Sequence, residues 1–117
     1  MHSTSVVSHL ITIRARAGQS VDLGARLGAL IASSSSAAGC LYFALHRSMT
    51  EEDVWLISGM WADKSAMNDW LAAPELEIFS ELVTALLVRS LDFQTFTTVT
   101  VAQTEQAYEL PDMRKAG

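Results

Sequence analysis

The stretch WLISGMWADKSAMNDWL, residues 55–71, decides the fold, because its hydrophobic pattern changes period halfway along. Its first half is an apolar run rich in side chains that favour a β-sheet. In its second half, Met67 and Trp70 lie at the spacing of a helix with one buried stripe. Asp63, between the halves, can cap that helix with its carboxylate. We therefore expect a strand that runs directly into a helix, with Trp61 at the junction.

The chain on either side of this stretch adds further strands and helices, indicated by period-two alternation and by apolar stripes at helical spacing. Ser20 can cap the helix that follows the first strand. Pro74 should separate the helix after Asp63 from a longer one, because proline disrupts a helix interior. The expected strands are residues 6–16, 40–47, 54–61 and 91–102; the long helix is residues 75–88, with Leu76, Phe79, Leu82, Val83 and Leu86 facing the sheet.

The order of these elements is β-α-β-β-α-β, the ferredoxin-like arrangement of an α+β protein: an antiparallel sheet with its helices on one face. The first three strands are apolar on both faces, but the helices can cover only one. We therefore expect a homodimer through the uncovered sheet face. Residues 1–5 are predicted to be a flexible N-terminus, 6–103 the domain and 104–117 a C-terminal tail.

Composition excludes several classes of protein. Half of the 117 residues are hydrophobic and 18% are charged, which argues against disorder. The net charge of −5, with scattered arginines, argues against a nucleic-acid partner. No run reaches the roughly 18 apolar residues of a membrane span, and the N-terminus lacks a secretory pattern. Cys40 is the only cysteine, so it has no internal disulfide partner. We expect a cytoplasmic protein that does not act on a membrane.

Short motifs then follow one another along the chain: RARAGQ at residues 14–19, GCLY at 39–42 with LHR at 45–47, WAD at 61–63, and WLAAP at 70–74. In order and spacing they resemble the antibiotic biosynthesis monooxygenase family, over roughly Val6 to Ala102. Members of that family are dimeric α+β barrels with a pocket between the sheet and helices of each subunit. They include quinol and anthrone monooxygenases that use dioxygen without metal or flavin, and relatives that degrade haem. The resemblance implies the same dimeric barrel here.

The chain departs from that family at polar positions. Many relatives have a histidine directly after the proline, where this chain has Glu75, and haem-degrading relatives have a ligand histidine at the position matching Ser80. Some anthrone-oxidising relatives have an asparagine at the position of Ile57. The tryptophan at the strand end matches, as Trp61. Without the ligand histidine or a metal-binding cluster, we expect no haem, no metal and no other cofactor.

Cofactor-free oxygenation needs a phenol-like substrate made anionic, because an electron-rich anion can pass an electron to dioxygen. We expect the catalytic residues to be His9, Tyr42 and Glu75. The near-neutral pKa of a histidine suits a base, and the tyrosine hydroxyl can donate to a substrate oxygen. Two alternatives stay open: His9 as a satisfied buried histidine, and Glu75 as a surface carboxylate that complements a helix dipole.

A mainly apolar pocket is expected between the sheet and the helices, walled by Trp61. Gly59 leaves a gap in the row of side chains that ends at Trp61, and Gly24 and Gly28 thin the helix above the sheet. These absent side chains would leave room for a flat ligand, although Trp61 could equally be part of the core. Four more residues are expected to bind substrate with it: Ile11, Ile57, Met67 and Phe79.

Together these observations predict a small homodimeric monooxygenase that acts on a hydroxylated aromatic or polyketide-like compound, with dioxygen as the second substrate. The alternative is a binding module of the same fold without turnover, which the missing histidine and asparagine favour. A Ser/His/Asp order, a phosphate-binding glycine loop and a dense metal cluster are absent from the sequence, so hydrolase, kinase and metalloenzyme functions have no support.

Overall fold

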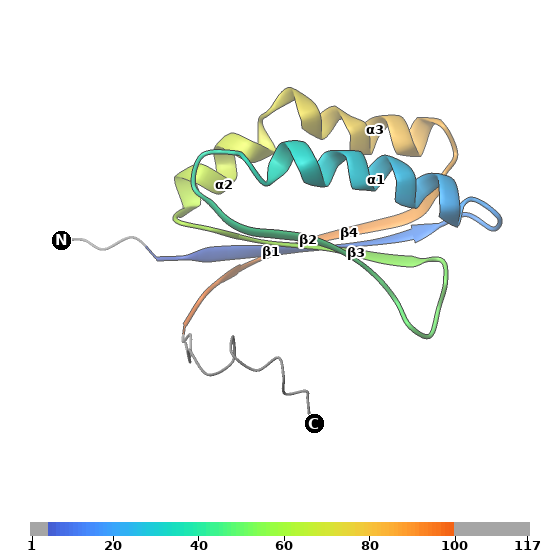
Figure 1. The fold of residues 1–117 in the computed structure, drawn as a ribbon, viewed down its shortest axis with the longest axis horizontal. Helices are drawn as coiled ribbons and strands as arrows, with labels where there is room; N and C mark the ends of the chain where they lie inside the picture. The colour runs from blue at the N-terminus through green and yellow to red at the C-terminus, as the bar shows by residue number, and fades with distance from the viewer. Residues whose placement is uncertain (1–4, 100–117) are drawn as a thin grey trace.

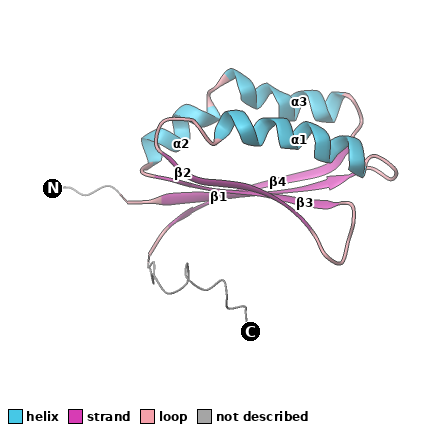
Figure 2. Cartoon of the chain, viewed as in Figure 1, coloured by secondary structure: helices cyan, strands magenta, loops and turns pink. Residues whose placement is uncertain are grey.

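The computed structural model describes residues 5–99, which form a four-stranded antiparallel sheet with helices on one face (Figures 1 and 2). The strand order is β2-β3-β1-β4, so β1 and β3 are central. This confirms the predicted α+β, ferredoxin-like arrangement. The elements are β1 (Val7–Ala15), α1 (Ser20–Ser34), β2 (Cys40–Arg47), β3 (Val54–Trp61), α2 (Lys64–Leu71), the 3-10 helix η1 (Pro74–Leu76), α3 (Glu77–Thr84) and β4 (Val88–Thr97).

The junction between β3 and α2 forms as its sequence predicts. The strand ends at Trp61, and the Asp63 carboxylate accepts a hydrogen bond from the amide of Ala66 at 2.8 Å. The predicted cap at Ser20 is wrong, because Ser20 is already the first residue of α1. Its hydroxyl instead donates to the carbonyl of Glu52 at 2.6 Å and accepts from the Trp55 indole at 3.0 Å. Ser20 therefore ties α1 to the sheet.

The core lies between the sheet and the helices. Along β1, every odd-numbered residue from Val7 to Ala15 is buried and every even-numbered one is half-buried on the opposite, uncovered face. The same face of β3 buries Ile57 and Trp61. From the helices the buried hydrophobic side chains are Leu23, Leu27, Leu30, Met67, Trp70 and Leu82. Within residues 5–99, no helix is long and apolar enough to cross a membrane.

The predicted end of the long helix is wrong. α3 stops at Thr84, and Val83 and Leu86 are more than half exposed instead of facing the sheet. The stop is a C-terminal motif in which the amides of Leu87 and Leu86 donate to the carbonyls of Leu82 and Val83, both at 3.1 Å. β4 consequently begins three residues before its predicted start, at Val88, and residues 100–102 of the predicted strand lie outside the described residues.

Leu86 has a φ of 63°, in the left-handed region where glycine is usual at this position of the motif. Its side chain is 61% exposed and contributes little burial. We expect Leu86→Gly to raise the free energy of unfolding by about 0.5–1 kcal/mol, because it removes backbone strain. Leu86→Ala is the matched control, since it also removes the side chain but keeps the strain. If urea unfolding shows both variants to be equally stable, the strain makes no measurable contribution.

Candidate functional site

His9 is fully buried on β1, directly opposite Gly59 of β3. A side chain at Gly59 would overlap the Cε1 atom of His9, and its Cβ would lie 3.0 Å from Nε2 and 3.1 Å from Nδ1. The gap that Gly59 leaves is therefore occupied by the imidazole and not by a ligand. The space beside Gly24 is occupied in the same way by the Trp55 ring, because a Cβ at position 24 would lie 2.5 Å from that ring.

Aromatic rings surround the imidazole of His9. Trp70 stacks on it with ring centroids 4.8 Å apart and an interplanar angle of 10°, and Phe43 meets it edge-on at 5.4 Å. Both tryptophans of this cluster also use their indole N–H groups: Trp61 donates to His9 Nδ1 at 3.1 Å, and Trp70 donates to the Ser34 hydroxyl at 2.9 Å. These contacts fix the position of the ring and the direction of its two nitrogens.

The hydrogen bond from Trp61 also determines where the His9 proton lies. Because Nδ1 accepts, the neutral imidazole carries its proton on Nε2 and presents an N–H donor there. Nε2 is buried and has no hydrogen-bond partner among the described residues. Burial lowers the pKa of His9 to about 4, so the ring is neutral at physiological pH. This arrangement argues against the predicted role of His9 as a base, since neither nitrogen is free to accept a proton.

The low pKa of His9 makes stability depend on pH. The unfolded chain binds this proton near pH 6.5, whereas the folded protein binds it only near pH 4. The contribution of neutral His9 to the free energy of unfolding is therefore complete above pH 6.5 and is lost as pH falls toward 4. We expect urea unfolding to show this loss in the wild type and a shallower loss in His9→Phe. His46→Phe, at an exposed site, should retain the wild-type slope; equal slopes in all three proteins would contradict the assignment.

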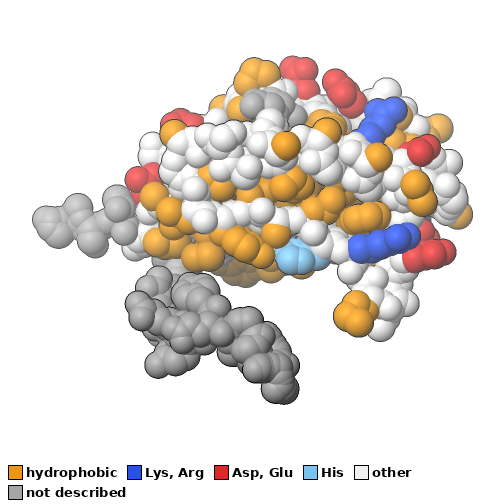
Figure 3. Space-filling model, viewed as in Figure 1, with side chains coloured by type: hydrophobic (Ala, Val, Ile, Leu, Met, Phe, Trp, Pro, Cys, Tyr) orange, Lys and Arg blue, Asp and Glu red, His pale blue; other side chains and the backbone are white. Residues whose placement is uncertain are grey.

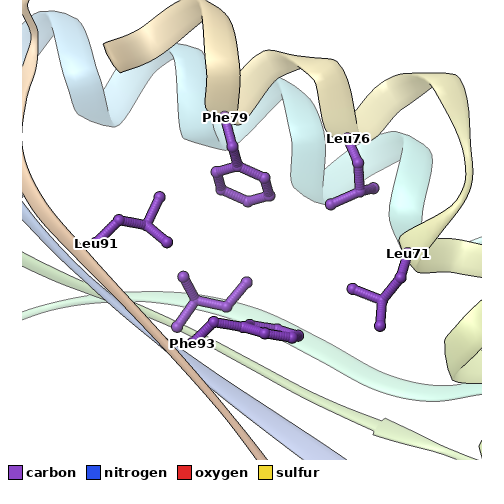
Figure 4. Close-up of a pocket in the computed structure, with 6 residues that line it drawn as sticks. Leu71, Leu76, Phe79, Leu91 and Phe93 are labelled. Carbon is purple, nitrogen blue, oxygen red and sulfur yellow. The ribbon is translucent and has the colours of Figure 1, made fainter.

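A cavity of about 230 Å³ opens next to this cluster, between β1 and β4 on one side and the segment from α2 to α3 on the other (Figure 4). Phe79 and Leu76 point from the helical side toward Leu91 and Phe93 on β4. Phe93 belongs to both features, because it lines the cavity and its ring centroid lies 6.0 Å from that of His9. The lining consists of hydrocarbon side chains only: Ile11, Leu71, Leu76, Phe79, Leu91 and Phe93.

The structure brings together some of the predicted binding residues but not all. Ile11 and Phe79 line this cavity. Trp61 faces the helices, as expected, but is fully buried and does not line the cavity. Ile57 and Met67 are also buried and do not contribute to the lining. For Trp61 and Ile57, the structure supports a place in the core. Met67 belongs to the core as well, and it also lines a separate cavity of about 160 Å³ between α2 and β4.

Two of the predicted catalytic residues, His9 and Tyr42, lie on opposite faces of the sheet. Tyr42 pairs with Met60 on the uncovered face of the sheet and is 47% exposed, on the opposite side from His9. Glu75 lies within η1, but its side chain is outside the described part of the structure. Among the described residues, no group of three or more His, Cys, Asp or Glu side chains could hold a metal ion.

Sequence reasoning missed the contribution of β4 to the cavity. Leu91 and Phe93 alternate within a strand that was predicted correctly in type, and this alternation places them on one face. That signal was available in the sequence. Their position beside Ile11 depends on the pairing of β1 with β4, which joins residues about eighty positions apart, as in Ile11 with Phe93.

Solved structures of other proteins share this fold. A protein of Pseudomonas aeruginosa superposes with a TM-score of 0.77 at 23% identity, covering 86% of this chain and all of its own. A protein of Mycobacterium tuberculosis gives 0.75 at 19%, covering 85% and 100%. SnoaB, a cofactor-independent oxygenase of Streptomyces nogalater, gives 0.69 at 17%, covering 87% and 98%.

A search of curated proteins finds no significant match to the chain. The profile of the antibiotic biosynthesis monooxygenase family, in contrast, matches residues 6–82, which include β1 through most of α3. That span covers more than half of the chain and contains the His9 cluster together with the helical side of the cavity. The chain therefore belongs to the antibiotic biosynthesis monooxygenase family.

Proposed function

We propose that this protein is a cofactor-independent monooxygenase acting on a hydroxylated aromatic compound of the quinol, anthrone or polyketide type. The observation that carries the proposal is the hydrocarbon-lined cavity between β1 and β4 on one side and the segment from α2 to α3 on the other. Phe79 and Phe93 offer ring faces to a flat ligand, and the hydrocarbon lining gives water no hydrogen-bond partner. Membership of the family and the fold shared with SnoaB support the same reaction class.

The reaction needs no external reductant. An anthrone-type substrate itself supplies the two electrons that reduce the second oxygen atom of dioxygen to water. Its ring carbon loses two hydrogens and gains one oxygen atom as a carbonyl, and the two hydrogens leave with the other oxygen atom as water. The protein's part is to hold the electron-rich ring in a dry site where charge on its oxygen is stabilised. The cavity residues can bind and orient the ring by apolar contact.

Oxygen uptake in the presence of quinols and anthrones tests this function. Leu91→Trp should abolish uptake by filling the cavity from the edge strand β4, where Leu91 is 37% exposed and a larger side chain is tolerated. Val21→Trp is the matched control, because Val21 is 76% exposed on α1 and does not line the cavity. Equal oxygen uptake by the two variants would show that the reaction does not take place in this cavity.

A binding module without turnover is the second candidate, favoured by the purely hydrocarbon lining of the cavity. Saturable binding of the same compounds without any oxygen uptake would support it.

We further propose that the protein is cytoplasmic, since its single thiol, Cys40, is free.

We also propose that the protein is a homodimer through the sheet face opposite the helices. Tyr42 and Phe96 are 47% and 44% exposed there, and Leu10, Leu56 and Met60 are only half-buried. Hydrophobic side chains are visible along this side of the sheet (Figure 3). A second copy would cover them, with about 2,000 Å² or more buried in total. Sedimentation should give twice the monomer mass at micromolar concentration, and a Tyr42→Glu variant should dissociate; a stable wild-type monomer would contradict the dimer.

A further inference from the structure

We propose that protonation of His46 strengthens the homodimer, because a two-fold axis along the strands brings His46 of each subunit against Asp92 of the other. This role of His46 rests on the homodimer proposed above and specifies how its two copies are oriented. It is independent of the reaction in the cavity.

The pairing of the strands places His46 and Asp92 at the two ends of one row across the uncovered face of the sheet. His46, on the edge strand β2, pairs with Leu56. Leu56 pairs with Thr12, which pairs in turn with Asp92 on the other edge strand, β4. Both end residues are exposed. Two parallel rows follow on the same face: first Ala44, Ser58, Leu10 and Gln94, then Tyr42, Met60, Ser8 and Phe96.

In a dimer of face-to-face sheets, the two-fold axis can run along the strands or across them. Such sheets lie about 10 Å apart, with their strands aligned to within about 30°. An axis along the strands, midway between β1 and β3, places β2 over β4 of the second copy and each row over its own equivalent. An axis across the strands, centred on the middle row, places β2 over β2 and exchanges the two outer rows.

The side chains on the two edge strands favour the axis along the strands. In that dimer Tyr42, an exposed aromatic side chain, meets Phe96 of the second copy, which is also exposed. His46 then meets Asp92, so an imidazole that can become cationic faces a carboxylate. In a dimer with the axis across the strands, Tyr42 would lie over His46, and Phe96 over Asp92. Each aromatic ring would then face a polar group, and the carboxylate would lack a cation.

The imidazole of His46 is placed to respond to pH. Its Nε2 lies 3.1 Å from the hydroxyl oxygen of Ser58, so when Nε2 donates to that hydroxyl, Nδ1 is left for the second copy. A protonated imidazole donates from both nitrogens, and its charge is attracted to the Asp92 carboxylate. Histidine is the side chain whose charge ordinarily changes between about pH 5 and 8. Lowering the pH within this range should therefore tighten the dimer.

The other groups on this face leave the pair unopposed. The neighbouring strand β3 presents no titratable side chain there, only Val54, Leu56, Ser58 and Met60. β2 itself adds Tyr42, which has no positive charge, and β1 adds Arg14 at its end. The Arg14 guanidinium lies 3.1 Å from the carboxylate of Glu51, in the β2–β3 connection. Within residues 5–99, Asp92 forms no ion pair in the single chain, so its carboxylate is available to the second copy.

The dissociation constant of the dimer at two pH values tests the role of His46. Fluorescence-detected sedimentation should show the wild-type dimer to be about 10-fold tighter near pH 5.5 than near pH 8, since symmetry gives two contacts per dimer. This range avoids protonation of His9, whose pKa is about 4 in the folded chain. Asp92→Asn keeps the side-chain shape but removes the carboxylate. It should reduce the effect to about 2-fold or less, the part due to the general loss of negative charge.

Exchanging the two residues gives a second variant with the same contact. His46→Asp alone places two carboxylates together and should weaken the dimer at both pH values. Adding Asp92→His to it puts a histidine opposite an aspartate again and should restore a dimer that tightens as pH falls.

Chemical cross-linking tests the orientation without relying on affinity. In a Cys40→Ser background, Ala44→Cys and Gln94→Cys place thiols at the two ends of the middle row. A short bis-maleimide should join two chains that carry both substitutions, because an axis along the strands sets position 44 over position 94 of the second copy. Chains with Ala44→Cys alone should stay unlinked. They would be linked if the axis ran across the strands, which sets position 44 over itself.

Equal wild-type affinity at both pH values, a full pH effect that survives in Asp92→Asn, or cross-linking through Ala44→Cys alone would each overturn this role of His46 and leave the dimer in place. A stable wild-type monomer would overturn both. If oxygen uptake is absent while the dimer responds to pH as expected, the monooxygenase fails and the role of His46 stands.

Discussion

Replacing Trp61 by alanine is expected to lower the free energy of unfolding by about 3–5 kcal/mol. Among residues 5–99, Trp61 is the largest fully buried side chain. It lies at the end of the central strand β3, where its ring meets that of Phe43 at an interplanar angle of 85°. The substitution leaves a cavity that the surrounding rings cannot close, and it removes the N–H that satisfies His9 Nδ1. Urea unfolding at neutral pH measures the loss.

Trp61→Phe separates the two contributions to that loss, because it keeps most of the apolar volume but has no N–H. It should cost about 1–3 kcal/mol, mainly from the unsatisfied nitrogen of His9. If Trp61 formed the wall of a ligand pocket, as the sequence predicts, Trp61→Ala would affect ligand binding more than folding. The complete burial of Trp61 now favours the reverse. A loss below about 1 kcal/mol for Trp61→Ala, with ligand binding abolished, would restore the original expectation.

The fold was predictable because its signals are local. The change of period between β3 and α2, the carboxylate of Asp63 and the proline at position 74 each act within a few residues, and the structure has the strand, cap and break at these places. The errors occur where tertiary contacts override a local preference. Ser20 is used to hold Trp55 and Glu52, and Leu86 takes a backbone conformation that its residue type disfavours.

The site was less predictable, because it depends on register between strands that are distant in the sequence. Simple alternation puts Tyr42 on the same face as Cys40, which pairs with Trp61. A bulge between Cys40 and Tyr42 shifts the pairing, so that Tyr42 pairs with Met60 and turns to the uncovered face. No turn-forming or strand-breaking residue at positions 40–42 indicates this bulge in the sequence. Likewise, only the β1–β3 register shows that the space above Gly59 belongs to His9.

That register leads to the second large effect: Gly59→Ala is expected to lower the free energy of unfolding by at least about 2 kcal/mol. An alanine normally stabilises a strand relative to glycine, so the sign of the effect identifies its cause. Here the new Cβ would overlap His9 Cε1. The imidazole cannot turn aside, because Trp70 stacks on one of its faces and Trp61 holds Nδ1. The backbone cannot retreat either, because β3 is paired on both sides.

A double-mutant cycle with His9→Ala tests this explanation, since removing the ring removes the overlap. The cost of Gly59→Ala should largely disappear in the His9→Ala background, which gives an interaction of at least about 1 kcal/mol. Gly28→Ala is the matched control: a Cβ there meets nothing within 4 Å, so it should stabilise α1 by up to about 1 kcal/mol. If the two substitutions at Gly59 and His9 prove additive, the imidazole does not fill the gap above Gly59. The position assigned to the His9 ring beside Gly59 would then be wrong.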